Sequence, residues 1–577
     1  MSNTNSLLLC INIALVCIAT SVAVDTDTDP ETAGTVSVRI KHGVINGRRQ
    51  SYEGRDVDVW LGIPYAQPPI GKLRFRKPLP VRQPWEQPLE ATQWPPACYQ
   101  VKIHQDFYNT NMSEDCLYLN IWSPSGHPLQ AQEPILKPVM LWIHGGGLAF
   151  GSASEHFYDG RVLSALGDVV VVTINYRLGV FGMMYTGQDG PAPGNMIFWD
   201  QSLAMEWVRD NIRYFGGDPH RVTLFGESAG GVSVGLHLVS PVTRHLYQNA
   251  IVMSGAPFID RFLTTRDELE ATWVRGVRQL GCRDNNNNEQ DKFTPELIQC
   301  LIRQPADKLV TLYGLLGDKT GSLLNIIIDG EFLPRNPRHM FSDGDYKRGV
   351  NLMIGGVEDE GSMVLGMADP QRYDKWAPAP ITGEQVLADF RAIIPWFTTD
   401  ASHIDTDSTI KHYFHGLTDP SAIRCRAGVA IGDLFLTCPT ILMAKAVHRG
   451  DPTARVYHYH YTAKMGDPKL FASSWMTGAG HFDDIYPVFG VPLVDEHRYV
   501  DGERLVSRQM IGIFSEFAYN GSPRSQGGAE WHAYYTVGGN VIAPYFEITG
   551  DTPVATNYGN NLKEIECEVL WKSALVN

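Results

Sequence analysis

A serine between two glycines, at the end of an apolar run, is the residue of this chain most suited to nucleophilic chemistry. Residues 221–225 (Arg-Val-Thr-Leu-Phe) lead directly into residues 226–230 (Gly-Glu-Ser-Ala-Gly). A strand that runs into Gly-x-Ser-x-Gly forms a nucleophile elbow, because glycines let the backbone turn sharply and expose the serine. We therefore predict that Ser228 is a nucleophile.

Such a serine needs partners, because its hydroxyl is a poor nucleophile at neutral pH. A base must accept its proton, an acid must orient the base, and hydrogen-bond donors must stabilise the tetrahedral oxyanion. After an elbow, the expected chain order is serine, then Asp or Glu, then histidine. The glycine run at residues 145–147, which follows the apolar segment 139–143, and the N–H group of Ala229 are the expected donors.

Three successive carboxylates compete for the role of the acid. Glu358, Asp359 and Glu360 follow the apolar residues 352–354, in a turn at the end of a predicted strand. The carboxyl end of a strand is where a doubly wound sheet places its functional residues. Spacing alone does not choose among the three.

The base must come from 18 histidines. His481 lies late in the chain in a loop of small residues, Gly-Ala-Gly-His-Phe-Asp-Asp at positions 478–484. His458 and His460 are nearby competitors, although their alternating setting is typical of a strand. The residues favour His481 and leave the other two open.

The elements that must position these residues are visible as short apolar, β-branched runs. They occupy residues 139–143, 169–174, 222–225 and 250–253. Continuous apolar runs suit strands buried on both faces, as in a parallel sheet. With helical patterns between them, over 200–214 for example, they predict an α/β protein with a mostly parallel, doubly wound central sheet. Residues 505–519 predict a further amphipathic helix.

Composition bounds the domain organisation and the partners. The 577 residues are 44% hydrophobic and carry a formal net charge of −15. Without an internal repeat or a Pro- or Ser-rich linker, residues 24–577 are predicted to form one catalytic domain with large insertions. The negative charge argues against nucleic acid as a partner, and the oligomeric state stays open, a homo-oligomer included.

The first 23 residues have the pattern of a secretory signal peptide. The apolar stretch 7–19 is followed by small residues at 20–23, although Lys and Arg are missing before it. The stretch is short for a membrane span, and no second long apolar run is evident. We expect a secreted, extracellular protein without a membrane span, with Asn111 and Asn520 as glycosylation acceptors.

Seven of the nine cysteines lie outside that signal. Pairs Cys98–Cys116 and Cys282–Cys300 would each close a short loop, with about 3 kcal/mol expected from chain entropy. The odd number leaves one cysteine over, and the residues alone do not say which.

Five further segments, together with the elbow, resemble the carboxylesterase/cholinesterase (type B) family over nearly the whole mature length. They are Gly-Ile-Pro-Tyr-Ala at 62–66, Glu-Asp-Cys-Leu-Tyr-Leu-Asn-Ile-Trp at 114–122, Asn-Tyr-Arg at 175–177, Asp-Gln at 200–201 and Phe-Gly-Gly-Asp-Pro at 215–219. The resemblance implies an α/β-hydrolase fold that works without a metal or organic cofactor.

The resemblance also implies residue roles. It makes Ser228 the nucleophile, Glu360 the acid and His481 the base of a catalytic triad. It makes the N–H groups of Gly146, Gly147 and Ala229 the oxyanion donors. The disulfides it implies are Cys98–Cys116, Cys282–Cys300 and Cys438–Cys567, with Cys425 left free.

The substrate pocket separates members of this family. Cholinesterases carry a tryptophan in the first disulfide loop, where a cation–π contact holds choline; residues 99–115 contain none. Met363 and Val364 stand where cholinesterases have aromatic residues, which suits a broader apolar acyl pocket. Phe258 is expected to line the pocket, and Glu227 resembles the glutamate beside the family nucleophile and would favour positive charge.

These features predict a serine hydrolase that cleaves small-molecule or lipid carboxylic esters through an acyl-enzyme. A cholinesterase and a bile-salt-activated lipase are alternatives. Segments 98–100, 105–106 and 481–485 are similar to such lipases, which however carry Asp as the triad acid and often have tail repeats, neither found here. An amidase is chemically feasible, and some family members are adhesion proteins without the nucleophile.

Overall fold

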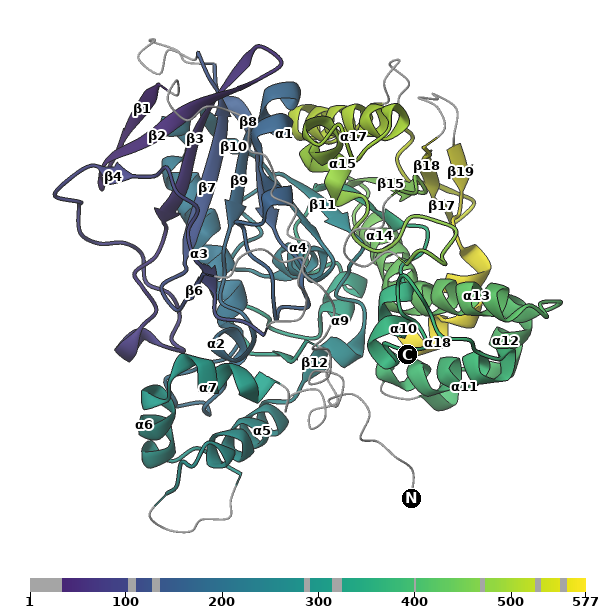
Figure 1. The fold of residues 1–577 in the computed structure, drawn as a ribbon. Coiled ribbons are helices and arrows are strands. Elements are labelled where there is room, and N and C mark those ends of the chain that lie inside the picture. The colour runs from purple at the N-terminus through teal and green to yellow at the C-terminus, as the bar shows by residue number, and fades with distance from the viewer. Residues whose placement is uncertain are drawn as a thin grey trace.

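The structure is a computed structural model, and it describes most of the chain after residue 33 (Figure 1). The described residues are 34–101, 111–126, 135–284, 291–313, 324–398, 401–466, 473–524, 531–550 and 558–576. The expected signal peptide therefore lies outside them, and the single domain expected over 24–577 stays a prediction.

A large mixed sheet forms the centre of the molecule. Its 13 strands run in the order β1-β2-β3-β7-β9-β8-β10-β11-β14-β15-β18-β19, with β4 paired to β2. The bounds are β1 Thr35–Ile40, β2 Gly43–Tyr52, β3 Arg55–Pro64, β4 Leu89–Glu90, β7 Tyr118–Pro124, β8 Lys137–Ile143, β9 Val170–Ile174, β10 Gly217–Glu227, β11 Asn249–Met253, β14 Asn351–Val357, β15 Arg455–Tyr461, β18 Pro544–Ile548 and β19 Tyr558–Asn560. The consecutive strands β9, β8, β10, β11, β14, β15 and β18 pair in parallel. The pairs β1–β2, β2–β3, β3–β7, β7–β9 and β18–β19 are antiparallel, and β4 adds to β2 in parallel.

Helices cover both faces of this sheet. The longer ones are α1 Arg161–Gly167, α3 Met196–Asn211, α4 Ala229–Val239, α5 Arg266–Gln279, α6 Pro295–Arg303, α10 Ser362–Ala368, α11 Gly383–Ile393, α12 Thr406–Phe414, α13 Pro420–Gly432, α14 Cys438–Gly450 and α17 Asp501–Asn520. Figure 1 shows α11, α12 and α13 grouped near α10 and the C-terminal helix α18 (Lys572–Val576), away from the antiparallel strands β1 to β3.

Alternate residues of β8 show how the sheet is buried. Val139, Leu141 and Ile143 belong to the apolar core that includes residues of α4. Met140 and Trp142 belong to a second core that includes residues of α17. Both faces of the strand are therefore covered, which explains its unbroken apolar run. The predicted α/β fold with a mostly parallel central sheet is confirmed.

The longest helical stretch, 420–450, joins α13 and α14 through a π-helical turn at Asp433–Thr437. Among the described residues it is the one segment long and apolar enough to cross a membrane, a property that the sequence analysis did not expect. However, 83% of its most apolar part is buried inside the protein. It is therefore accounted for as a core helix.

The described chain contains three disulfides, two across short loops and one between distant segments. Cys98 pairs with Cys116 and Cys282 pairs with Cys300. Cys438 at the start of α14 pairs with Cys567 near the C-terminus, 129 positions later. Cys425 is the free cysteine among the described residues. These are the pairings that the family resemblance implied.

A buried ion pair joins the segment after β9 to α3. The Arg177 guanidinium donates to both carboxylate oxygens of Asp200, each at 2.7 Å, and the Arg177 backbone N–H donates to the same carboxylate at 3.0 Å. Both side chains are inaccessible to solvent, with exposed fractions of 3% and 0%. If one partner is removed, water therefore has little access to the charged group that remains.

We expect Asp200→Asn to lower the free energy of unfolding by about 3–5 kcal/mol, because the mutation leaves a buried guanidinium without its counter-charge. Urea unfolding followed by circular dichroism measures the change. Asp210→Asn on the same helix is the matched control, since the Arg209–Asp210 pair at 2.8 Å is largely exposed. A control that destabilises as much as Asp200→Asn would contradict the role of burial.

Candidate active site

The nucleophile elbow is the turn between β10 and α4. Ser228 has φ 56° and ψ −122°, a left-handed conformation that costs energy for a residue with a Cβ. The turn is held by the Ser228 N–H, which donates to the Met253 carbonyl at 2.9 Å. A Cβ on Gly230 would lie 2.1 Å from the Ile143 carbonyl oxygen, and one on Gly226 would lie 2.7 Å from the Gly230 backbone. Both glycines of the motif are therefore required by close backbone approach.

The glycine run after β8 lies against this elbow. A Cβ on Gly145 would lie 2.8 Å from the Glu227 carbonyl oxygen and 3.1 Å from the Ser228 Cβ. Gly146 and Gly147 both have left-handed φ angles, 102° and 59°. A Cβ added to Gly147 would meet no described atom within 4 Å, so this residue borders open space.

Ala229 contributes through its place in the fold. It is the first residue of α4, and the N–H groups of a first helical turn have no partner within the helix. The three residues predicted as oxyanion donors thus lie at the elbow or in the run that contacts it. Their role as donors stays a prediction.

In the turn after β14, which we call the acid turn, one of the three candidate carboxylates contacts His481. Glu360 is 1% exposed, and its Oε1 accepts the Val357 N–H at 3.0 Å. Its Oε2 lies 2.6 Å from Nδ1 of His481, which is also 1% exposed. The structure therefore brings Glu360 and His481 together across 121 positions of sequence.

Of the other two residues, Asp359 holds the loop that carries His481. The Asp359 N–H donates to the Ala479 carbonyl at 2.9 Å, and the Asp359 Oδ2 accepts the Gly478 N–H at 2.5 Å. Burial raises the pKa of Asp359 to about 6. A Cβ on Gly478 would lie 2.3 Å from the Glu358 Oε2, so this loop passes close to the acid turn.

The competing histidines lie elsewhere. His458 and His460 are on β15, as their alternating pattern predicted. The His458 Nδ1 is 3.0 Å from the Tyr534 hydroxyl, and burial lowers the pKa of His458 to about 3. Burial also lowers the pKa of His460 to about 4. Both side chains are thus kept neutral within the structure.

A second carboxylate faces the other nitrogen of His481. Glu227 is fully buried, and its Oε1 lies 3.0 Å from His481 Nε2, within ion-pair range but without hydrogen-bond alignment. Among the described residues neither oxygen of Glu227 has a hydrogen-bond partner. Because Glu227 directly precedes Ser228, the Nε2 side of the imidazole lies beside the elbow.

Burial and charge act on this group of residues together. Burial raises the pKa of Glu227; His481 opposes that shift, and Asp484 and Glu360 add to it. Burial alone would lower the pKa of His481, but the carboxylates of Glu227, Glu360 and Asp484 outweigh it and raise the pKa. The site therefore stabilises positive charge on the imidazole.

Asp484 is a residue of this site that the sequence analysis did not single out. It is fully buried, and its Oδ2 accepts the Tyr459 hydroxyl at 2.8 Å. Burial raises the pKa of Asp484 to about 7. The sequence feature that could have identified Asp484 is the pair of carboxylates, Asp483 and Asp484, shortly after the candidate base.

The remaining predicted site residues are placed as follows. Phe258 is buried with its ring 5.6 Å from that of Phe341. Met363 and Val364 lie on α10, directly after the acid turn, and Val364 is buried. Their contact with substrate stays a prediction.

Both predicted glycosylation acceptors, Asn111 and Asn520, are exposed. The Asn520 amide donates to Glu516 at 2.7 Å. Within the described part of the chain, no group of three or more His, Cys, Asp or Glu side chains is arranged to hold a metal ion.

Comparisons with known proteins identify the family of this chain. Residues 34–569 match the Carboxylesterase family. The chain is 36% identical over 523 residues to an acetylcholinesterase from Bungarus fasciatus, covering 88% of this chain and 82% of that protein. It is 33% identical over 527 residues to an acetylcholinesterase from Leptinotarsa decemlineata, covering 86% of this chain and 80% of that protein.

Proposed function

This chain belongs to the carboxylesterase family and is a carboxylic ester hydrolase, and from that premise we propose that Ser228, His481 and Glu360 form its catalytic triad. The observation that carries the proposal is the buried contact of 2.6 Å between Glu360 and His481 Nδ1, with Nε2 turned to the residue before Ser228.

The reaction follows from these positions. Ser228 Oγ attacks the ester carbonyl, and His481 takes the serine proton and returns it to the leaving alcohol. Glu360 fixes the imidazole tautomer and stabilises the imidazolium, and Glu227 adds negative charge on the other side of the ring. Water then attacks the acyl-serine by the same route and releases the acid.

The oxyanion is stabilised by backbone donors. The N–H groups of Gly146, Gly147 and Ala229 converge on the position where the substrate carbonyl oxygen becomes negatively charged. Each such donor contributes about 3 kcal/mol to transition-state stabilisation. The open space beside Gly147 supports this assignment because a carbonyl oxygen must be able to enter there.

The protein is proposed to act outside the cell. Three disulfides support this, because disulfides persist in oxidising compartments. The signal peptide at 1–23 and the glycans at Asn111 and Asn520 belong to the same proposal.

For the substrate we propose a broad range of small-molecule or lipid esters, on the basis of Met363 and Val364 beside the acid turn. A cholinesterase is a second candidate of equal standing, because both relatives described above are acetylcholinesterases. Turnover of acetylthiocholine, p-nitrophenyl butyrate and emulsified triglyceride separates the cholinesterase, the carboxylesterase and the lipase.

We expect a fluorophosphonate to inactivate the enzyme with a stoichiometry of about one, by phosphonylating the activated serine oxygen. Peptide mass spectrometry should place the adduct on Ser228. Urea-unfolded protein is the control and should stay unlabelled, since activation requires the folded site. An adduct on another serine of the folded enzyme would contradict the assignment of the nucleophile.

A further inference from the structure

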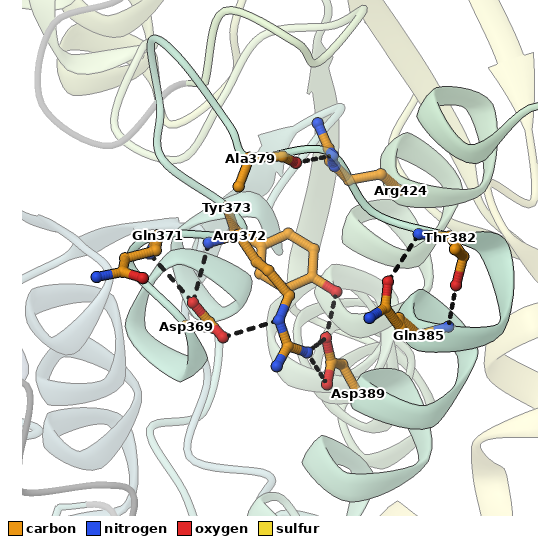
Figure 2. A network of polar contacts seen from close by, with 9 residues as sticks. All are labelled: Asp369, Gln371, Arg372, Tyr373, Ala379, Thr382, Gln385, Asp389 and Arg424. Atoms are coloured by element: carbon orange, nitrogen blue, oxygen red, sulfur yellow. Dashed lines mark hydrogen bonds and ion pairs between the residues drawn. The ribbon is translucent and has the colours of Figure 1, made fainter.

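A polar cluster joins the end of α10 to α11, and we call it the Arg372 clamp (Figure 2). It consists of Asp369, Arg372, Tyr373 and Asp389. The Arg372 Nη1 lies 2.8 Å and 2.7 Å from the two carboxylate oxygens of Asp389, and its Nε lies 3.0 Å from Asp369. The Tyr373 hydroxyl donates to Asp389 at 2.9 Å. One guanidinium thus holds two carboxylates from different elements.

The clamp fixes the loop 369–379 at its start, and Arg424 fixes it at its end. Asp369 Oδ1 accepts the N–H groups of Gln371 and Arg372, which shapes the first turn. The Arg424 guanidinium on α13 donates to the Ala379 carbonyl at 2.8 Å. Figure 2 shows both attachments on either side of Tyr373. The loop therefore has a defined path between α10 and α11.

This loop contacts the segment that precedes His481 in the chain. The Trp475 indole N–H donates to the Asp374 carbonyl at 3.1 Å, and the Ser474 N–H donates to the Lys375 carbonyl at 2.8 Å. The Tyr373 ring lies 6.3 Å from the Trp475 ring, and the Arg424 guanidinium lies 5.9 Å from it. The two groups that fix the loop thus also contact Trp475.

Only five residues separate Trp475 from His481. Between them, Gly478 is already bonded to Asp359 in the acid turn. The same loop begins where α10 ends, and α10 begins directly after that acid turn. Loop 369–379 therefore links the acid turn, through α10, to the segment that precedes His481.

We propose that Arg372, Tyr373 and Asp389 are positioning residues, which set the imidazole of His481 through Trp475. The inference rests on the proposed triad. The side chains of Arg372 and Asp389 are 38% and 24% exposed, so this pair contributes little to global stability. A displacement well under 1 Å at the reacting atoms is nevertheless sufficient to slow catalysis.

The test compares kcat and KM for p-nitrophenyl butyrate in Asp389→Asn and Tyr373→Phe with the wild-type values. We expect Asp389→Asn to lower kcat about tenfold while KM changes by less than about twofold, because the base moves and the pocket does not. Tyr373→Phe removes one hydroxyl and should give a smaller loss in kcat. Asp389→Glu, which keeps the charge, should recover most of the lost rate.

Asp291→Asn is the matched control, because the pair of Asp291 with Arg275 of α5 has the same 2.7 Å separation and comparable exposure. It should keep the wild-type kcat. A double-mutant cycle of Asp389→Asn with Trp475→Phe, which removes the indole N–H and keeps a ring, should be non-additive.

Equal kcat in Asp389→Asn and the Asp291→Asn control, or strict additivity with Trp475→Phe, would overturn the positioning role. Thermal unfolding of each variant separates a local effect from loss of folded protein. Wild-type turnover and its loss in Ser228→Ala test the proposed triad independently. If these hold and the clamp variants have no effect, the positioning role alone is wrong.

Discussion

Replacement of Ser228 by alanine is expected to lower kcat for p-nitrophenyl butyrate by about four to six orders of magnitude. The mutation removes the one atom that forms the acyl-enzyme, so the base, the acid and the oxyanion donors lose the group on which they act. The protein should stay folded, because alanine keeps the backbone hydrogen bonds of the turn and adds no atoms. Steady-state hydrolysis and a thermal melt measure the two quantities.

Ser202→Ala is the control for loss of a serine hydroxyl. Ser202 is buried, whereas Ser228 is half-buried, and the Ser202 hydroxyl donates to the Phe198 carbonyl within α3. Ser202→Ala should keep kcat within about twofold, since the substitution leaves the surroundings of the reacting atoms unchanged. More than a few per cent of wild-type turnover in Ser228→Ala would assign the nucleophile to another residue.

Glu360→Gln is expected to lower kcat by about three to four orders of magnitude, because the imidazole loses the carboxylate that fixes its tautomer and stabilises its charged form. The buried contact of 2.6 Å to Nδ1 is the interaction removed. Hydrolysis of p-nitrophenyl butyrate at saturating concentration measures the loss. Glu358→Gln is the matched control in the same turn and should keep most of the activity.

The same variant should also shift the pH profile in a defined direction. His481 must be neutral to accept a proton, so kcat/KM rises with pH through its pKa. Burial lowers that pKa and the carboxylates of Glu227, Glu360 and Asp484 raise it more, so removing Glu360 lowers it. The acidic limb of the profile should therefore move to lower pH in Glu360→Gln. An unchanged limb, or one at higher pH, would contradict the contact between the two residues as the cause.

The parallel centre of the fold was predictable from the sequence because strands buried on both faces have continuous apolar runs. Strands β8, β9 and β11 and residues 222–225 of β10 lie between two helical layers, so most of their residues are apolar. The antiparallel strands were not predicted. In β2 (Gly43–Tyr52) most residues are partly or fully exposed, and polar side chains interrupt any apolar run.

The elbow at Ser228 was predictable for a similar reason, since the backbone approach at Gly226 and Gly230 excludes every side chain. The acid was not predictable from spacing, because Glu358, Asp359 and Glu360 are successive residues of one turn. Which of them faces His481 depends on a loop that arrives from 121 positions away. Only the family resemblance selected Glu360, and the geometry agrees with that selection.

The attachment of Asp359 to residues 478 and 479 has a consequence for engineering. The acid turn and the loop that carries His481 are joined into one unit, although they come from separate thirds of the chain. A chimera that takes either half alone from a relative would break this unit, whereas transfer of both halves would keep it. Substrate preference is therefore best altered by exchanging the surrounding walls and leaving the unit whole.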